Sequence, residues 1–268
     1  MIKQFRMNVT NGSGQRFTYA MGYQFYGMLM EKLEPEYVAR LHAEQLTPIN
    51  QSLVPVKNGE EAVWTVNILG EEAIDKAAPV LDQLESMTMT NNELDIRIVS
   101  KECTELSTVQ DIIKSASEAY HSNRTLMSFL TPTSFKSKET YMLFPSVEHI
   151  VGSLINKWNM YSGYIKIEDS DAQRFMIDGI KIDSYRLQSS YYHLKGAVIP
   201  GFIGHVVLNS KLPAPLQEIW HLLLFFSSYC GVGIKTSLGM GSVRTNDFVK
   251  KTVRISSEQE KTEGFAPG

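Results

Sequence analysis

The alternation of apolar and polar positions predicts a regular order of strands and helices in the first half of the chain. Tyr26, Met30 and Leu33 recur at helical spacing. Pro35 follows them and is suited to the first turn of a second short helix. The expected elements are a strand at 2–9, two helices within 22–46, strands near 52–56 and 62–69, a helix at 73–87 and a strand at 94–100.

The second half repeats much of this order. Ser146 is a plausible N-cap for one of its helices, and Pro200 with Gly201 predicts a bend within a strand. The polar stretch 160–190 is not resolved by its pattern and leaves a helix or a long insertion open. The expected elements are strands at 125–135 and 141–145, a helix at 146–159, a broken strand at 193–210, an apolar helix at 214–230 and a strand at 241–249.

Both halves are therefore compatible with βαββαβ, the ferredoxin-like order. The predicted fold class is α+β, with two tandem ferredoxin-like (RRM-like) domains. We expect the first domain at 1–120, the second at 124–255 and a polar, mobile tail at 256–268, with the boundary in the segment 118–124.

Composition supports a packed chain without a membrane span. The 268 residues are 43% hydrophobic and 21% charged, which allows a sizeable core. No apolar run approaches the roughly 20 residues that cross a bilayer, and the N-terminus lacks the apolar segment of a signal peptide. Cys103 and Cys230 lie far apart and form no metal-ligand spacing, which favours a reducing cytoplasm. The sequence predicts neither a metal site nor a cofactor.

Charge is divided unevenly between the two halves. Residues 1–123 hold 10 Lys and Arg against 17 Asp and Glu, a net of −7, and residues 124–268 hold 16 against 12, a net of +4, which together give the overall −3. A basic face in the second half could attract phosphate, because salt screens the acidic half beyond roughly 8–10 Å. Two solvated surfaces of different sign explain the same counts equally well.

A glycine-rich segment, CGVGIKTSLGMGSVRT, follows the apolar helix and raises the question of a phosphate site. A dinucleotide fingerprint needs a third glycine where Thr236 stands, and a Walker loop needs glycine where Ile234 precedes Lys235. Both also need a helix after the loop, where we expect a strand. A nucleotide-binding enzyme is therefore disfavoured.

The paired spacing of Gly231 and Gly233 with Gly239 and Gly241 needs another explanation. A helix C-cap accounts for one or two of these glycines. Four of them indicate positive φ at several points, or backbone that lies close to something bulky. Exposed N–H groups beside Lys235 suit an extended phosphate backbone.

This G-x-G-x₅-G-x-G spacing after an apolar helix resembles the C-terminal signature of the RAMP superfamily, the RNA-binding proteins of CRISPR systems. Further stretches resemble one branch, the CRISPR repeat-processing endoribonuclease of type III-like systems: SFLTPTSFKSKETYMLFPSVEHIVGSLINKWN, VIPGFIGHVVLN, GIKTSLGMGSV and LMEKLEPEYVARLHAEQLTP. The resemblance spans most of the chain.

The resemblance implies cleavage within the repeat of a CRISPR precursor transcript. The 2′-OH attacks the adjacent phosphorus and leaves 2′,3′-cyclic phosphate and 5′-OH ends, without a metal because the nucleophile belongs to the RNA. The expected partners are the repeat RNA, with type III effector subunits and a second copy of the chain as further candidates. The alternative is a non-catalytic RAMP subunit that only holds RNA in an effector complex.

The resemblance also assigns the catalytic histidine to the Leu-His pair at 41–42. An imidazole exchanges protons near cellular pH, and a surface histidine on a short helix is the structural alternative for His42. The family often adds a tyrosine in the preceding helix and a lysine a few residues later. This chain has Met30 at the tyrosine position, with Tyr26 one turn earlier as the nearest substitute or as a core aromatic. It has Pro48 in place of the lysine, and its first downstream lysine is Lys57.

The basic second half supplies the expected RNA contacts, for which a solvated edge is the alternative. Those proposed are Gly231, Gly233, Lys235, Thr236, Ser237, Gly239, Gly241 and Arg244 around the loop, and Lys136 and Lys138 after the TPT strand.

Overall fold

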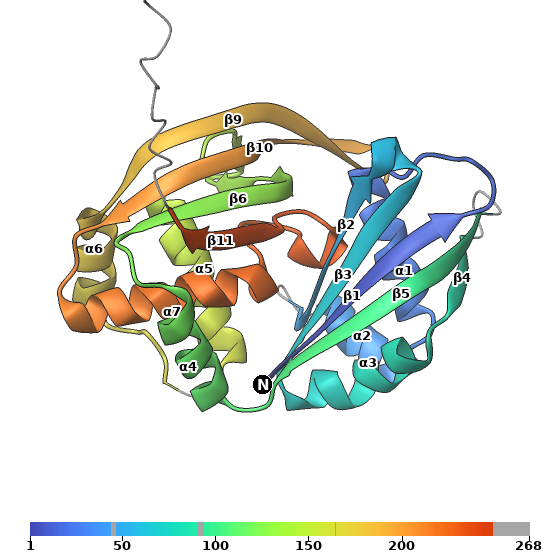
Figure 1. Cartoon of the computed structure of the whole chain (residues 1–268), viewed down its shortest axis with the longest axis horizontal. Helices are drawn as coiled ribbons and strands as arrows, with labels where there is room; N and C mark the ends of the chain where they lie inside the picture. Colours follow the sequence, from blue (N-terminus) through green and yellow to red (C-terminus); the bar gives the residue numbers. More distant parts are fainter. Residues whose placement is uncertain (44–46, 90–93, 164, 249–268) are drawn as a thin grey trace, which may run out of the picture.

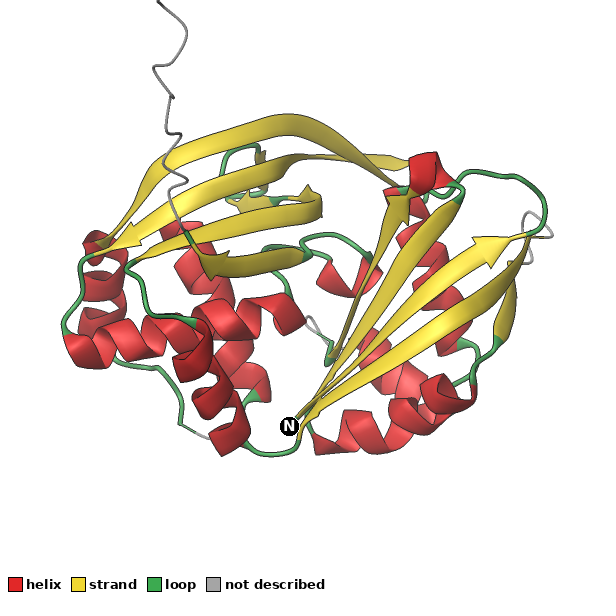
Figure 2. Ribbon diagram, viewed as in Figure 1, coloured by secondary structure: helices red, strands yellow, loops and turns green. Residues whose placement is uncertain are grey.

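Two antiparallel sheets lie side by side, and each packs its helices against one face (Figures 1 and 2). The structure is a computed structural model that describes residues 1–43, 47–89, 94–163 and 165–248. The predicted tail, 256–268, lies outside these residues. Within them, no helix is both long enough and apolar enough to cross a membrane.

The first sheet has the strand order β2-β3-β1-β5-β4, which is the ferredoxin-like order with β4 added at one edge. Its strands are β1 (Ile2–Asn11), β2 (Ile49–Val56), β3 (Glu61–Leu69), β4 (Ser86–Met89) and β5 (Leu94–Leu106), and its helices are α1 (Gly22–Met30), α2 (Pro35–Ala43) and α3 (Glu71–Gln83). The helix expected to reach residue 87 ends at Gln83 instead. Alternating burial of Met87 and Met89 explains why the next residues form a strand.

The second sheet has the order β11-β6-β10-β9, again ferredoxin-like. Its strands are β6 (Arg124–Thr133), β9 (Ile180–Leu194), β10 (Ala197–Ser210) and β11 (Val243–Asp247), and its helices are α5 (Val147–Tyr161), α6 (Ser170–Gly179) and α7 (Ala214–Cys230). Two short strands, β7 (Phe135–Ser137) and β8 (Thr140–Met142), form a separate ribbon where a strand at 141–145 was expected. Ser146 caps α5 as predicted, because its hydroxyl accepts the His149 N–H.

The stretch 160–190, whose sequence pattern left a helix or a long insertion open, contains α6 and most of β9. The single broken strand predicted at 193–210 is instead the end of β9 and the whole of β10. Lys195 and Gly196 separate β9 from β10 with φ angles of 47° and 82°. Two consecutive positive φ angles are what a two-residue hairpin turn requires. The predicted bend at Pro200 does not interrupt β10, because pairing with β6 begins only at Phe202. A proline is tolerated where a strand has one neighbour.

Each sheet has its own core. In the first, Phe25 of α1 packs edge-on against Trp64 of β3, with ring centroids 5.2 Å apart. In the second, Trp158 of α5 packs edge-on against Phe226 of α7 at 5.3 Å. Each such buried aromatic ring contributes about 2–3 kcal/mol. The second core also takes in Ile112 of α4 (Val109–Ala119), a helix that follows the first sheet in the chain.

Candidate active site

His42 lies in the last turn of α2 and points away from the core. Tyr37 and Leu41 are one helical turn apart and bury the inner face of α2. The next position lies about 100° further round the helix, which explains why the His42 side chain is exposed. The helix ends one residue later, so the imidazole lies at the surface near the end of α2.

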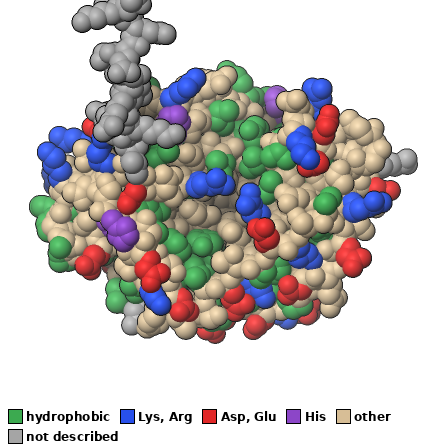
Figure 3. All heavy atoms as spheres, in the orientation of Figure 1, with side chains coloured by type: hydrophobic (Ala, Val, Ile, Leu, Met, Phe, Trp, Pro, Cys, Tyr) green, Lys and Arg blue, Asp and Glu red, His purple; other side chains and the backbone are tan. Residues whose placement is uncertain are grey.

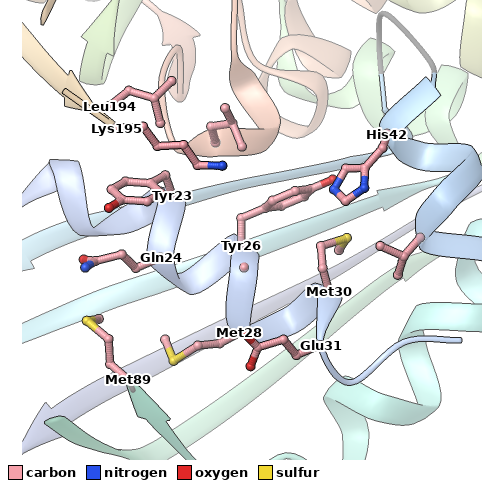
Figure 4. A pocket seen from close by; sticks show the side chains of 13 residues that line it. Tyr23, Gln24, Tyr26, Met28, Met30, Glu31, His42, Met89, Leu194 and Lys195 are labelled. Atoms are coloured by element: carbon pink, nitrogen blue, oxygen red, sulfur yellow. The ribbon is translucent and has the colours of Figure 1, made fainter. Parts of the chain in front are cut away.

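A cavity of about 620 Å³ opens beside His42 and is shared by the two halves of the chain. Tyr26, Met30 and Val38 line it from the first half, and Leu194, Lys195 and Leu238 line it from the second half. Figure 4 shows the Tyr26 ring and the His42 imidazole pointing toward one another, with Lys195 reaching in from the opposite wall. The site therefore depends on how the two ferredoxin-like units pack.

Tyr26 is 7% exposed, and its burial raises the pKa of its phenol, which a hydrogen bond to the Thr47 side chain only partly opposes. The phenol therefore stays protonated at neutral pH and can donate a hydrogen bond. Met30, at the position where the family often has tyrosine, also lines the cavity but has no proton to give. Lys57 pairs with Glu61 at 2.7 Å and does not line this cavity.

The glycine-rich loop, defined as residues 231–241, lies at the contact between the two halves. Gln51 of β2 donates through Nε2 to Gly22 O of α1 at 2.7 Å and to Ser237 O of the loop at 3.1 Å. The Tyr192 hydroxyl of β9 donates to Leu238 O. These bonds place Leu238 in the wall of the His42 cavity, so two motifs far apart in the sequence meet at one site.

All four glycines of the loop have positive φ, between 66° and 104°, which confirms the expectation from their spacing. What lies close to their backbone is the protein itself. A Cβ at Gly241 would stand 2.1 Å from Val232 O, and one at Gly233 would stand 2.3 Å from Ser134 O. The need for glycine at these two positions follows from the fold, whatever the loop binds.

A buried lysine holds the start of the loop. Lys157 of α5 donates to Cys230 O at 3.0 Å, to Gly231 O at 3.1 Å and to Thr236 Oγ1 at 3.3 Å. Burial lowers the pKa of Lys157 to about 8 and raises the pKa of the Cys230 thiol to about 12. The thiol is therefore neutral at pH 7, and oxygen dipoles stabilise the ammonium. Sequence reasoning missed Lys157, since a lysine in an apolar helix has no distinguishing pattern.

The predicted RNA-contact residues fall into two groups. Lys235, Arg244, Lys136 and Lys138 are exposed, and Ser237 is half-buried. Thr236 is buried, and its hydroxyl donates to Asn50 Oδ1 while it accepts from Lys157. Its side chain is therefore used inside the protein. The four glycines are also buried or half-buried.

The strand leading to Lys136 runs against the loop. Ile234 N donates to Ser134 O at 3.0 Å, and Gly241 N donates to Pro132 O at 3.0 Å. The backbones of the TPT segment and the glycine-rich loop are therefore joined by hydrogen bonds. Lys136 itself pairs with Glu139.

A row of polar groups crosses the face of the second sheet away from its helices. Arg244 of β11 pairs with Ser128 of β6, Ser128 with His205 of β10, and His205 with Arg186 of β9. Directly paired residues share one face of a sheet. Lys and Arg side chains also lie at the centre of the face seen in Figure 3, where the two halves meet. Sequence reasoning missed Arg186, because its strand lies in the polar stretch 160–190, whose secondary structure the sequence pattern left open.

Among the described residues, no three His, Cys, Asp or Glu side chains are grouped as metal ligands.

Comparisons with known proteins agree along most of the chain. Residues 127–243 match the family model described as CRISPR-associated endoribonuclease Cas6. The chain is 33% identical over 228 residues to the CRISPR-associated endoribonuclease Cas6 of Streptococcus thermophilus, an alignment that covers 84% of this chain and 90% of that protein. It is 24% identical over 230 residues to the protein of the same name from Mycobacterium tuberculosis, covering 84% and 71%.

Solved structures share the fold. A Cas6 product complex has a TM-score of 0.73 at 19% identity and covers 91% of this chain and 100% of that one. The Thermus thermophilus Cas6 has a TM-score of 0.70 at 20% identity, covering 91% and 98%. A RAMP protein described as binding different RNA substrates has a TM-score of 0.58 at 12% identity, covering 91% and 100%. The tandem ferredoxin-like fold is confirmed.

Proposed function

The chain belongs to the Cas6 family of CRISPR-associated endoribonucleases, and from this membership we propose that it cleaves CRISPR precursor RNA within the repeat at the cavity lined by His42. The relatives are named as endoribonucleases, so a purely scaffolding RAMP subunit is not favoured. The observation that carries the site is that His42 and Tyr26 line one cavity which the glycine-rich loop also borders through Leu238.

The proposed reaction needs a proton to leave the attacking 2′-OH and a proton to reach the departing 5′ oxygen. The P–O bond to the 2′ oxygen forms as the bond to the 5′ oxygen breaks, which gives a 2′,3′-cyclic phosphate and a 5′-OH. His42 is the imidazole at the cavity and serves as the general acid or base of this exchange. Tyr26, kept protonated by burial, donates a hydrogen bond to the oxygens that gain charge.

Binding of the repeat is proposed to use exposed basic groups of the second half. The proposed phosphate contacts are Lys235 and Ser237 on the loop and Lys136 and Lys138 beyond the TPT segment, and the three lysines are exposed. Arg244 extends the surface onto the row that includes His205 and Arg186. The buried Thr236 and the glycines support binding by shaping the loop. Most of the loop's backbone N–H groups are used inside the protein, since those of Gly231, Val232, Gly233, Ile234, Leu238, Met240 and Gly241 donate to protein oxygens.

The test is cleavage of the cognate repeat RNA in EDTA under single-turnover conditions. Wild type is expected to cleave, and His42→Ala to lose about 10²–10⁴-fold in rate with unchanged RNA affinity. Tyr26→Phe should lose less, because water can replace one hydrogen-bond donor. His121→Ala is the matched control, since His121 is exposed but does not line the cavity.

An inactive wild type in EDTA would contradict the metal-independent reaction. Unchanged cleavage by His42→Ala would leave the activity in place and remove this site.

Two further partners remain part of the proposal: subunits of a type III effector complex and a second copy of the chain. The cytoplasm is the compartment we propose, and it suits free thiols at the exposed Cys103 and the buried Cys230. Gel filtration of the protein with and without repeat RNA reports whether a dimer forms.

A further inference from the structure

We propose that Lys195, at the tip of the β9–β10 hairpin, contacts the scissile phosphate and supplies the positive charge that stabilises the transition state of the cleavage. This inference rests on the proposed function of the His42 cavity. It assigns an electrostatic role to a residue of the second half, since no lysine among the described residues of the first half lines the His42 cavity.

The reaction creates a need for such a charge. As the 2′ oxygen attacks, the phosphorus becomes five-coordinate and its non-bridging oxygens gain negative charge. His42 and Tyr26 move or share protons, but neither is a permanent cation. Preorganised donors aimed at developing charge are usually a large part of catalysis, and the loss of one commonly costs 10²–10³-fold in rate.

Lys195 is the one Lys or Arg among the described residues that line the cavity. Figure 4 shows its ammonium group extending into the space between Tyr23 and Tyr26, across from His42. The carboxylate in the lining is Glu31, on the wall formed by the end of α1. A phosphate entering this space therefore meets one fixed positive charge, at the hairpin.

The hairpin tip is held in place by its neighbours. Lys195 has a φ of 47°, and Gly196 completes a two-residue turn that projects the lysine beyond the end of the sheet. Tyr192, three residues earlier, is fully buried, and its hydroxyl donates to Leu238 O in the glycine-rich loop. The same hydroxyl would lie 3.2 Å from a Cβ at Gly22, at the start of α1. The Tyr192 end of the hairpin therefore lies against the start of α1, the helix that carries Tyr26.

The ammonium is also available. Lys195 is exposed and has no ion pair among the described residues, whereas Lys57 pairs with Glu61 and Lys136 with Glu139. Its approach to a phosphate displaces water rather than a carboxylate. An exposed lysine on a two-residue turn can bind a phosphate oxygen as a point charge.

The experiment measures single-turnover cleavage of cognate repeat RNA at saturating protein, together with the Kd, for wild type, Lys195→Ala, Lys195→Arg and Lys181→Ala. Lys181 is the matched control, because it is an exposed lysine at the other end of β9. Lys195→Ala is expected to lose about 10²-fold in the saturated rate with a Kd within about 3-fold of wild type. Lys195→Arg should recover most of the rate, and Lys181→Ala should match wild type.

Two results would overturn the inference: a saturated rate for Lys195→Ala equal to wild type, or a loss of affinity with an unchanged saturated rate, which would place the lysine on a flanking phosphate. Urea unfolding of each variant confirms that the fold is intact. If His42→Ala abolishes cleavage while Lys195→Ala does not slow it, this inference fails and the proposed function stands. If wild type does not cleave, the proposed function itself fails.

Discussion

The glycine-rich loop and the His42 site face the same cavity but are built in opposite ways. The loop is enclosed by its own protein: Gly241 lies against Val232 O, Lys157 donates three hydrogen bonds around it, and Gln51 ties it to the first half. His42 stands on the surface at a helix end, and no hydrogen bond of its side chain is found among the described residues. Packing within the protein therefore constrains the loop, whereas little packing constrains the His42 side chain.

The difference in burial predicts different effects of substitution in the two regions. Substitutions of the buried loop residues are expected to act first on stability and through it on RNA binding. Substitutions at His42 are expected to act on the reaction alone, because an exposed side chain contributes little to folding.

Replacement of a loop glycine should destabilise the fold. Gly241→Ala adds a Cβ 2.1 Å from Val232 O at a residue with a φ of 69°. Strain and overpacking together should lower the free energy of unfolding by about 3 kcal/mol. Urea denaturation followed by circular dichroism measures this. Gly152→Ala is the matched control, since Gly152 lies within α5 with no atom within 4 Å of the added Cβ.

Gly152→Ala should be neutral or slightly stabilising, because alanine favours a helix. A Gly241→Ala variant as stable as Gly152→Ala would show that the loop is not specified by its internal packing.

The buried Lys157 should make stability depend on pH. Its folded pKa, about 8, lies below the unfolded value of 10.5, so between these pH values the unfolded state binds the extra proton. The free energy of unfolding should therefore rise with pH in this window, by about 1 kcal/mol per pH unit from this group. Thermal or urea unfolding at pH 8 and 9, compared with Lys157→Met, isolates the contribution.

The range ends at pH 9 because the Cys230 thiol, whose folded pKa is raised to about 12, has an effect of opposite sign above its ordinary value of 9.0. Equal pH slopes for wild type and Lys157→Met would mean that the lysine does not titrate in the folded protein near pH 8.

An exposed loop cation should have the smallest effect, and on RNA binding alone. Lys235→Ala should weaken repeat binding a few-fold and reduce the slope of log affinity against log salt by about 0.7, as expected for one lost phosphate contact with a single strand. Fluorescence anisotropy across a salt series measures both. Asn246→Ala, also exposed and on β11, is an uncharged comparison. An unchanged slope for Lys235→Ala would remove this lysine from the RNA surface.

The order of elements could be predicted from the sequence because helical and strand periodicities are local. Apolar spacing in α1 and α7, the proline that starts α2 and the serine that caps α5 all report on neighbours within a few residues. The positive φ angles of the loop could also be predicted from its glycines, since positive φ is a property of single residues. The resemblance pointed to His42 through its Leu-His pair. The secondary structure of 160–190 could not be predicted, because β9 is an edge strand with mostly exposed side chains and therefore has no apolar alternation.

The composition of the candidate site was decided only by the tertiary structure. Thr236 points inward because Asn50, 186 residues earlier, accepts its hydroxyl. Lys195 reaches the cavity because a hairpin of the second half docks against α1 of the first. Both facts depend on how the two units pack against each other. The residues next to Thr236 or Lys195 in the sequence do not indicate that contact. The two ferredoxin-like units and the constrained loop follow from patterns in the sequence, and His42 follows from the family resemblance, whereas the packing of the units determines which side chains share the site.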